Sequence, residues 1–240
     1  MWSYHLGPQK LIELGVALGR PFPERGMSPQ ATFFQFGLVP ALRAVLRDRV
    51  VSSSRSEVAL HHVAVTWARS PVVDDAIGGS VDVAEENGAF RAEGECTAAG
   101  SPLCTFSLLL GPHEVAAPTV PENEPVARMT CDAARGLAFA AATWDLNPAY
   151  WSERFARAAG LSGLVVPPGL PAAWLVDLAE QGRGPCSSMR IDFFRAARVG
   201  EVLSAYRSYP EGSLMAVANA FPSVAATFVS GEEPGGPSNL

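Results

Sequence analysis

Apolar and polar residues alternate along this chain in two patterns, and each pattern occurs twice. Segments 37–42 and 169–174 both begin with Gly-Leu and continue with apolar residues at helical spacing, which predicts one buried helix in each place. Segments 65–69 and 191–195 alternate apolar and polar residues, as half-buried strands do. The chain therefore repeats a helix followed by a strand.

Further strands follow in each repeat. Valine-containing segments 81–83 and 202–206 predict partner strands, and a Thr-Phe pair closes each repeat, at 105–106 and at 227–228. One long helix followed by several antiparallel strands predicts a sheet wrapped around a helix. Two such units side by side give an α+β protein with an internal repeat.

Proline and glycine mark the boundaries between these units. Segment 112–125 contains four prolines and predicts an extended linker, and segment 232–240 is too poor in apolar residues to fold by itself, which predicts a flexible tail. The predicted organisation is an N-terminal half at 1–111, this linker, a C-terminal half at 126–231 and the tail.

Composition narrows the class of protein. The chain of 240 residues is 48% hydrophobic and 18% charged, and its net charge of −6 is spread out without a basic stripe, which argues against nucleic acid as a partner. No apolar run approaches the roughly 20 residues of a membrane span, and no secretory signal precedes the first unit, so we expect a cytoplasmic protein without membrane contact. The four cysteines lack zinc-ligand spacing and predict free thiols, without metal.

The candidate chemistry lies in the second half. Segment 144–150 has the sequence Trp-Asp-Leu-Asn-Pro-Ala-Tyr, and Pro-Pro-Gly at 167–169 opens the second buried helix. An aspartate in a dry pocket gains basicity, which suits Asp145 to proton transfer. A glycine at a helix start, here Gly169, offers an unhindered backbone N–H to a developing oxyanion. Alone, each segment also fits an ordinary turn or helix start.

Together the two segments resemble the MaoC-like, or (R)-specific enoyl-CoA hydratase, family, in which Asp-x-Asn-Pro-x-His precedes a helix entered through a glycine. The resemblance is clearest over 126–231 and implies a double hot dog fold, in which the first half, lacking the motif, forms a wall. It also implies that Asp145 is a catalytic acid or base, that Asn147 bonds backbone in the loop, and that Gly169 binds the thioester oxygen. Tyr150 stands where the family has its catalytic histidine.

Three functions follow as alternatives. A hydratase or dehydratase would use Asp145 as base while Tyr150 helps the hydroxide leave, although a phenol with a pKa near 10 is a poor base at neutral pH. A repurposed cyclase or isomerase of secondary metabolism would hold a polyketide-like chain in the cavity, with Tyr150 as a hydrogen-bonding partner. A noncatalytic member would only bind an acyl chain or another protein. Ser152, where relatives tend to have a second acid, departs further from the hydratase pattern.

The remaining expectations concern the substrate. Four residues are predicted to line the site beside Gly169: Pro168, Leu170, Trp151 and Trp174. Arg190 and Arg195 are candidates for the phosphates of coenzyme A or of a carrier-protein arm, or are solvated strand residues. His61 and His62 are placed before a predicted strand, from which either could reach the groove. No cofactor or metal is expected, and the protein is a monomer or a homodimer.

Overall fold

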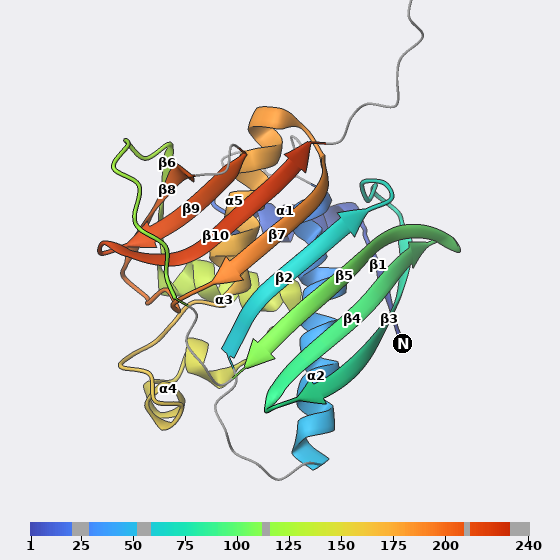
Figure 1. Cartoon of the computed structure of the whole chain (residues 1–240), viewed down its shortest axis with the longest axis horizontal. Helices are drawn as coiled ribbons and strands as arrows, with labels where there is room; N and C mark the ends of the chain where they lie inside the picture. The colour runs from blue at the N-terminus through green and yellow to red at the C-terminus, as the bar shows by residue number, and fades with distance from the viewer. Residues whose placement is uncertain (21–28, 52–58, 112–115, 209–211, 231–240) are drawn as a thin grey trace, which may run out of the picture.

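One large antiparallel sheet, covered on a single face by helices, forms the protein (Figure 1). The computed structural model describes residues 1–20, 29–51, 59–111, 116–208 and 212–230, with backbone alone for 46–51. The ten strands lie in the order β1-β3-β4-β5-β2-β7-β10-β9-β8-β6.

Each half of the chain contributes five strands and its own helices. The first half contains β1 (Trp2–His5), α1 (Pro8–Ala17), η2 (Pro29–Thr32), η3 (Phe34–Leu38), α2 (Val39–Val51), β2 (Ala59–Trp67), β3 (Ala76–Glu86), β4 (Ala89–Ala98) and β5 (Ser101–Gly111). The second half contains β6 (Ala127–Thr130), α3 (Ala133–Thr143), η4 (Pro148–Tyr150), α4 (Glu153–Ala158), α5 (Gly169–Arg183), β7 (Cys186–Phe193), β8 (Val202–Ser208), β9 (Ser213–Ala218) and β10 (Phe221–Ser230).

The two halves repeat one topology and meet at the middle of the sheet. From the centre outward the first half reads β2-β5-β4-β3-β1 and the second reads β7-β10-β9-β8-β6. At the centre β2 pairs antiparallel with β7, in a register that runs from His62 opposite Asp192 to Thr66 opposite Ser188. This repeated arrangement confirms the predicted α+β double hot dog, with the refinement that its two sheets are continuous.

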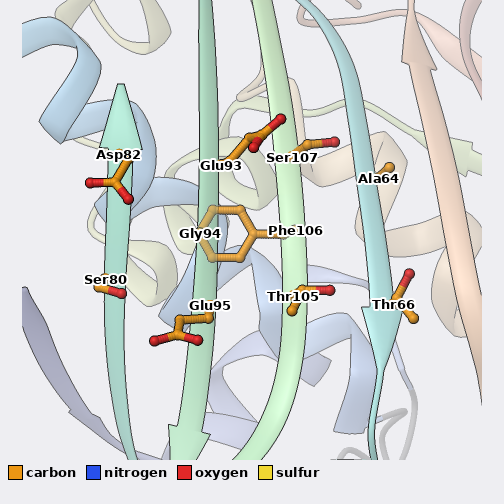
Figure 2. A pocket seen from close by; sticks show the side chains of 10 residues that line it. All are labelled: Ala64, Thr66, Ser80, Asp82, Glu93, Gly94, Glu95, Thr105, Phe106 and Ser107. Carbon is orange, nitrogen blue, oxygen red and sulfur yellow. The ribbon is translucent and has the colours of Figure 1, made fainter. Parts of the chain in front are cut away.

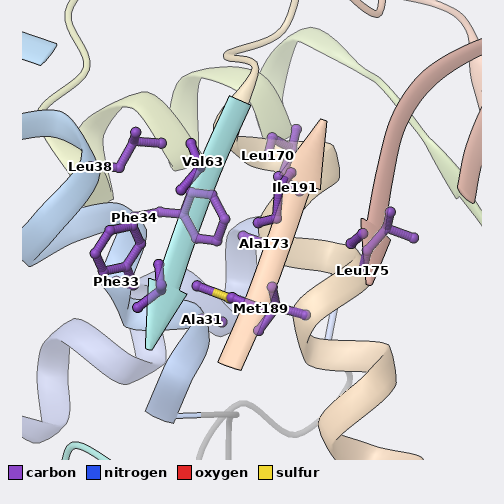
Figure 3. Close-up of a cluster of buried hydrophobic side chains, with 14 of the residues drawn as sticks. Ala31, Phe33, Phe34, Leu38, Val63, Leu170, Ala173, Leu175, Met189 and Ile191 are labelled. Atoms are coloured by element: carbon purple, nitrogen blue, oxygen red, sulfur yellow. The ribbon is translucent and has the colours of Figure 1, made fainter. Parts of the chain in front are cut away.

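The core lies between the central strands and the helices. Val63 on β2 and Met189 and Ile191 on β7 point toward Phe34 and Leu170 on the helical layer (Figure 3), and all five side chains are buried. Burying apolar surface here stabilises the fold by roughly 25 cal/mol per Å² removed from water. The seam between the halves is therefore part of one hydrophobic core.

A helix forms at the predicted position 37–42, but it is part of an irregular helical segment rather than a uniform α-helix. This segment runs through a 3-10 turn (η2), a π-helical segment (η3) and only then α2. Pro40 has no N–H to bond the carbonyl of Phe36 four residues earlier, and the indole Nε1 of Trp2 donates to that carbonyl instead, at 2.6 Å. A Cβ at Gly37 would collide with the ring of Phe33, so the aromatic packing also depends on this glycine.

The central strands begin earlier than predicted, which corrects the placement of two histidines. His61 and His62 lie within β2 rather than before it, because a β-bulge between Leu60 and His62 interrupts the alternation that marks a strand. Residues 116–125 contain no helix or strand. The rest of the predicted linker, 112–115, and the predicted tail at 232–240 fall outside the described residues.

Candidate active site

The candidate site follows directly on the C-terminal end of helix α3. The first turn of this helix is capped by Asp132, whose carboxylate accepts a hydrogen bond from the backbone N–H of Arg135 at 2.7 Å. At the other end Trp144 adopts φ 61° and ψ 24°, the left-handed conformation that often ends helices. The chain leaves the helix there, and Asp145 is the first residue of the loop.

Asn147 shapes the turn that follows. Its side-chain Oδ1 accepts from the backbone N–H of Ala149 at 3.0 Å, and its carbonyl accepts from the N–H of Tyr150 at 3.1 Å. Pro148 is the first residue of the short helix η4, where a fixed φ and a missing N–H cost nothing. Asn147 therefore bonds backbone and turns Tyr150 back toward α3.

The turn brings Asp145 and Tyr150 into direct contact. The Tyr150 hydroxyl donates to Oδ2 of Asp145 at 2.7 Å. Burial raises the pKa of Asp145 above its ordinary value, while the Tyr150 hydrogen bond and the charge of Arg43 oppose that rise. Burial, the nearby carboxylate and the same hydrogen bond raise the pKa of Tyr150, so the phenol stays protonated. The pair thus combines a carboxylate of increased basicity with a proton donor.

Gly169 begins helix α5 after Pro168, its half-buried N-cap. Within the described residues no backbone carbonyl accepts from the N–H of Gly169, as expected for the first turn of a helix. A Cβ at this position would meet the ring of Phe139 at 3.1 Å and that of Phe34 at 3.3 Å. The absence of a side chain therefore lets α5 start close against two aromatic rings.

Helix α3 also connects Gly169 with the carboxylate–phenol pair. Tyr150 packs in a small buried cluster with Ala140 and Val165, and the preceding residue of α3, Phe139, packs on Gly169. Two consecutive residues of one helix thus hold Tyr150 and the start of α5.

The other predicted lining residues divide into buried and exposed. Leu170 and Trp174 are 0% and 6% exposed. Both side chains belong to the hydrophobic core between α5 and the sheet. Trp151 is 44% exposed, and its ring meets that of Tyr150 edge-on with centroids 6.3 Å apart. Trp144 is exposed as well. Ser152 gives no side-chain cap to α4, the helix that it precedes.

Two polar residues of the first half reach this region and were not predicted from the sequence. Gln35 in η3 donates through Nε2 to the carbonyl of Ala142 at 3.1 Å, and the guanidinium of Arg43 on α2 donates to the carbonyl of Trp144. Gln35 carries a sequence signal, since it is a single amide inside the aromatic run 33–36. Arg43 carries none, because it looks like any exposed helical arginine.

The predicted phosphate-binding arginines are engaged elsewhere. Arg190 forms an ion pair with Asp192, which in turn bonds His62 Nδ1 at 2.9 Å on the central seam. Arg195 pairs with Glu201 at 3.1 Å. These contacts fit structural roles in the sheet better than binding of a substrate phosphate.

A groove of about 600 Å³ lies over strands β3, β4, β5 and β2 (Figure 2). Three exposed carboxylates line it, those of Asp82, Glu93 and Glu95. None of the predicted site residues is among its lining residues. In the described part of the chain no group of three or more His, Cys, Asp or Glu side chains is placed to hold a metal ion. The described helices are also too short or too polar to cross a bilayer.

Comparison with known proteins supports the resemblance noted in the sequence. The family model for the FAS1-like dehydratase domain region matches residues 130–209, a stretch that contains Asp145, Tyr150 and Gly169. No curated protein sequence matches the chain.

Solved structures match over nearly the whole chain. HtdX of Mycobacterium tuberculosis is 14% identical with a TM-score of 0.73, covering 96% of this chain and 98% of that one. A MaoC-like dehydratase from Phytophthora capsici is 12% identical with a TM-score of 0.74, covering 97% and 94%. An acyl-ACP thioesterase from Bacteroides thetaiotaomicron is 11% identical with a TM-score of 0.54, covering 95% and 96%. These structures share the double hot dog fold with this chain, and the family-model match over 130–209 is to a dehydratase domain region.

Proposed function

We propose that the protein is a hydro-lyase that removes water from a 3-hydroxyacyl thioester, or adds water to the enoyl thioester. The observation that carries this proposal is the 2.7 Å hydrogen bond between buried Tyr150 and half-buried Asp145. A carboxylate and a proton donor in contact are the two groups that such a reaction needs.

The dehydration step balances with these two groups alone. The Asp145 carboxylate takes the α-proton, the C–O bond at the β-carbon breaks, and the departing hydroxide takes the phenol proton of Tyr150 and leaves as water. Asp145 is then protonated and Tyr150 is a phenolate. Transfer of one proton along their hydrogen bond restores both, and the raised pKa of Tyr150 favours that transfer.

The start of α5 would support the same step. Negative charge develops on the thioester oxygen as the α-proton leaves, and the N–H of Gly169 at a helix N-terminus is suited to stabilise it. An acyl thioester of coenzyme A or of a carrier protein is the substrate class that this proposal implies. The thioesterase of similar fold from Bacteroides thetaiotaomicron is an acyl-ACP thioesterase, which is consistent with that class.

The experiment that tests the proposal incubates the purified protein with a panel of enoyl and 3-hydroxyacyl thioesters. Mass spectrometry then detects gain or loss of one water. Asp145→Asn is the critical variant, because it keeps the size and one acceptor of the side chain but removes its basicity. The matched control is Asp132→Asn, which changes the cap of α3 and leaves the site carboxylate in place.

We expect turnover by the wild type and by Asp132→Asn and none by Asp145→Asn. Equal turnover by Asp145→Asn would overturn the assignment of the base. No turnover of any thioester would overturn the hydro-lyase proposal and favour the alternative, a cavity reused for cyclisation of a polyketide-like chain or for acyl binding.

Two further parts of the proposal concern the domain organisation of the chain and its cellular compartment. We propose that 1–111 and 126–231 are the two hot dog halves, joined by 112–125. The described cysteines are all free thiols, which supports a reducing compartment such as the cytoplasm.

A further inference from the structure

The first half of the chain caps the end of the helix that carries the candidate site. The last carbonyl groups of an α-helix have no partner within the helix, and cations near that end are favourable. At the end of α3, Gln35 donates to the carbonyl of Ala142, and Arg43 donates to the carbonyl of Trp144. Both donors come from the helical segment η3–α2, in the half that lacks the Asp-x-Asn-Pro motif.

The Arg43 bond acts at a strained point of the backbone. Trp144 is a bulky residue with positive φ, a conformation that is unfavourable for an L-residue and needs support from its surroundings. Asp145 follows directly, and its carboxylate turns inward to Tyr150. Holding the carbonyl of Trp144 therefore fixes the peptide unit from which the Asp145 side chain departs.

Arg43 also acts on Asp145 through its charge. Burial destabilises the ionised form of the Asp145 carboxylate, and the guanidinium of Arg43 together with the hydrogen bond from Tyr150 favours it. Arg43 itself is exposed and lies on a different element from either member of the pair. It is thus a cation supplied by the other half of the molecule.

We propose that Arg43 is a positioning residue for the Asp145–Tyr150 pair, so that the half without the motif completes the active site of the other half. This inference rests on the proposed hydro-lyase function. It assigns to Arg43 no contact with substrate: Arg43 acts by holding the carbonyl of Trp144, and its charge favours the ionised form of Asp145.

The test compares Arg43→Met, which removes the donors and the charge, with Arg43→Lys, which keeps a charge and a donor. Arg91→Met replaces a surface arginine of β4 whose side chain is 64% exposed, and serves as the control. We expect Arg43→Met to lower kcat by about tenfold with little change in KM, because ground-state binding is intact and the base is misplaced. Arg43→Lys should recover most of the loss, and Arg91→Met should match the wild type.

The pH profile separates positioning from general damage to the fold. Dehydration needs ionised Asp145, so activity rises with pH through the pKa of that group. Removing the Arg43 charge raises this pKa, and the acid limb of the profile should move to higher pH in Arg43→Met and return in Arg43→Lys. An unchanged limb and an unchanged kcat in Arg43→Met would overturn the inference.

A readout without substrate distinguishes failure of this inference from failure of the proposed function. A wild type that turns over no thioester defeats the proposed function. In that case the pH dependence of the free energy of unfolding still reports on the pKa of Asp145. Stability falls as pH rises through this pKa, and in Arg43→Met the fall should continue to higher pH. Adding Asp145→Asn to the wild type and to Arg43→Met should abolish the difference between them in the pH dependence of unfolding. If the two curves coincide in the presence of Asp145, the positioning role is wrong.

Discussion

At the scale of single residues, the protein departs from the hydratase pattern at Tyr150, which stands in place of the histidine, and again at Ser152. Histidine can act as acid or base near neutral pH, whereas tyrosine in a buried site acts as a donor. The direct bond between Tyr150 and Asp145 leaves the carboxylate as the base of the pair. We therefore propose Asp145 as the base, because burial raises the pKa of its carboxyl group.

A first prediction concerns the effect of this half-buried carboxylate on stability. The folded pKa of Asp145 is raised, so its stabilising contribution is fully present below the unfolded value of about 3.9 and is lost as pH rises through the folded value. Asparagine does not titrate, so Asp145→Asn does not lose stability in this way. Its free energy of unfolding relative to wild type should therefore increase as pH rises from the unfolded pKa to the folded pKa of Asp145. Chemical denaturation at a series of pH values measures it, with the exposed Asp82→Asn as control. A parallel pair of curves for wild type and Asp145→Asn would contradict the prediction.

At the scale of elements, α3 and α5 organise the site, and both depend on features that short sequence patterns show only in part. The Asp-x-Asn-Pro spacing and the glycine before an apolar run were sufficient to identify the turn and the start of α5. The π-helical stretch of the first-half helix was not predictable in the same way, because Trp2 reaches its Phe36 carbonyl from a distant strand. Local patterns report local preferences, whereas this contact is tertiary.

Helix α5 contains a matched pair of glycines that tests its packing. Gly169 lies against Phe139 and Phe34, whereas a Cβ at Gly182 would meet nothing within 4 Å. We expect Gly169→Ala to lower the free energy of unfolding by about 1 kcal/mol through overpacking. Gly182→Ala should raise it by about 0.5–1 kcal/mol, because alanine favours the helix. Thermal and chemical unfolding of both variants measure the difference, and a stabilised Gly169→Ala would show that the close contact is wrong.

The C-terminal part of α5 carries a second buried carboxylate. Burial and the charge of Asp177 raise the pKa of Glu180 to about 7, while a hydrogen bond from the backbone of Gln30 and the charge of Arg20 oppose the rise. Its stabilising contribution is present below the unfolded value and is lost as pH rises through about 7.

Relative to wild type, the free energy of unfolding of Glu180→Gln should therefore increase on the order of 1–3 kcal/mol from about pH 5 to about pH 8. This figure allows for the partial solvent exposure of the group. Unfolding curves at the two pH values test this. Glu153→Gln on the exposed face of α4 is the control and should show no comparable gain.

At the scale of the whole molecule, the first half supports the helix layer of the second half. Arg43 of the first half bonds the end of α3, and Arg20 of the first half forms an ion pair with Asp177 on α5, with Nε 2.8 Å from Oδ2. The sheet is continuous through β2 and β7. The sequence repeat predicted two units of one design, but contacts between the units join residues more than a hundred positions apart, and no short pattern encodes them.

The Arg20–Asp177 pair gives a prediction at this scale. The side chain of Asp177 is 3% exposed, so Arg20→Met removes a cation that pairs with a buried carboxylate. We expect a loss of about 3 kcal/mol in the free energy of unfolding, against about 0–1 kcal/mol for Arg91→Met in an exposed pair. Equal losses in the two variants would mean that this ion pair between the halves contributes little.

The most direct test of the central claim is exchange of the α-hydrogen of a 3-hydroxyacyl thioester in deuterated water. If Asp145 is the base, the wild type should introduce deuterium at the α-carbon, detected by mass spectrometry or NMR, and Asp145→Asn should not. Exchange at the same rate in both proteins, or none in the wild type, would contradict the assignment of Asp145 and Tyr150 as the reacting pair.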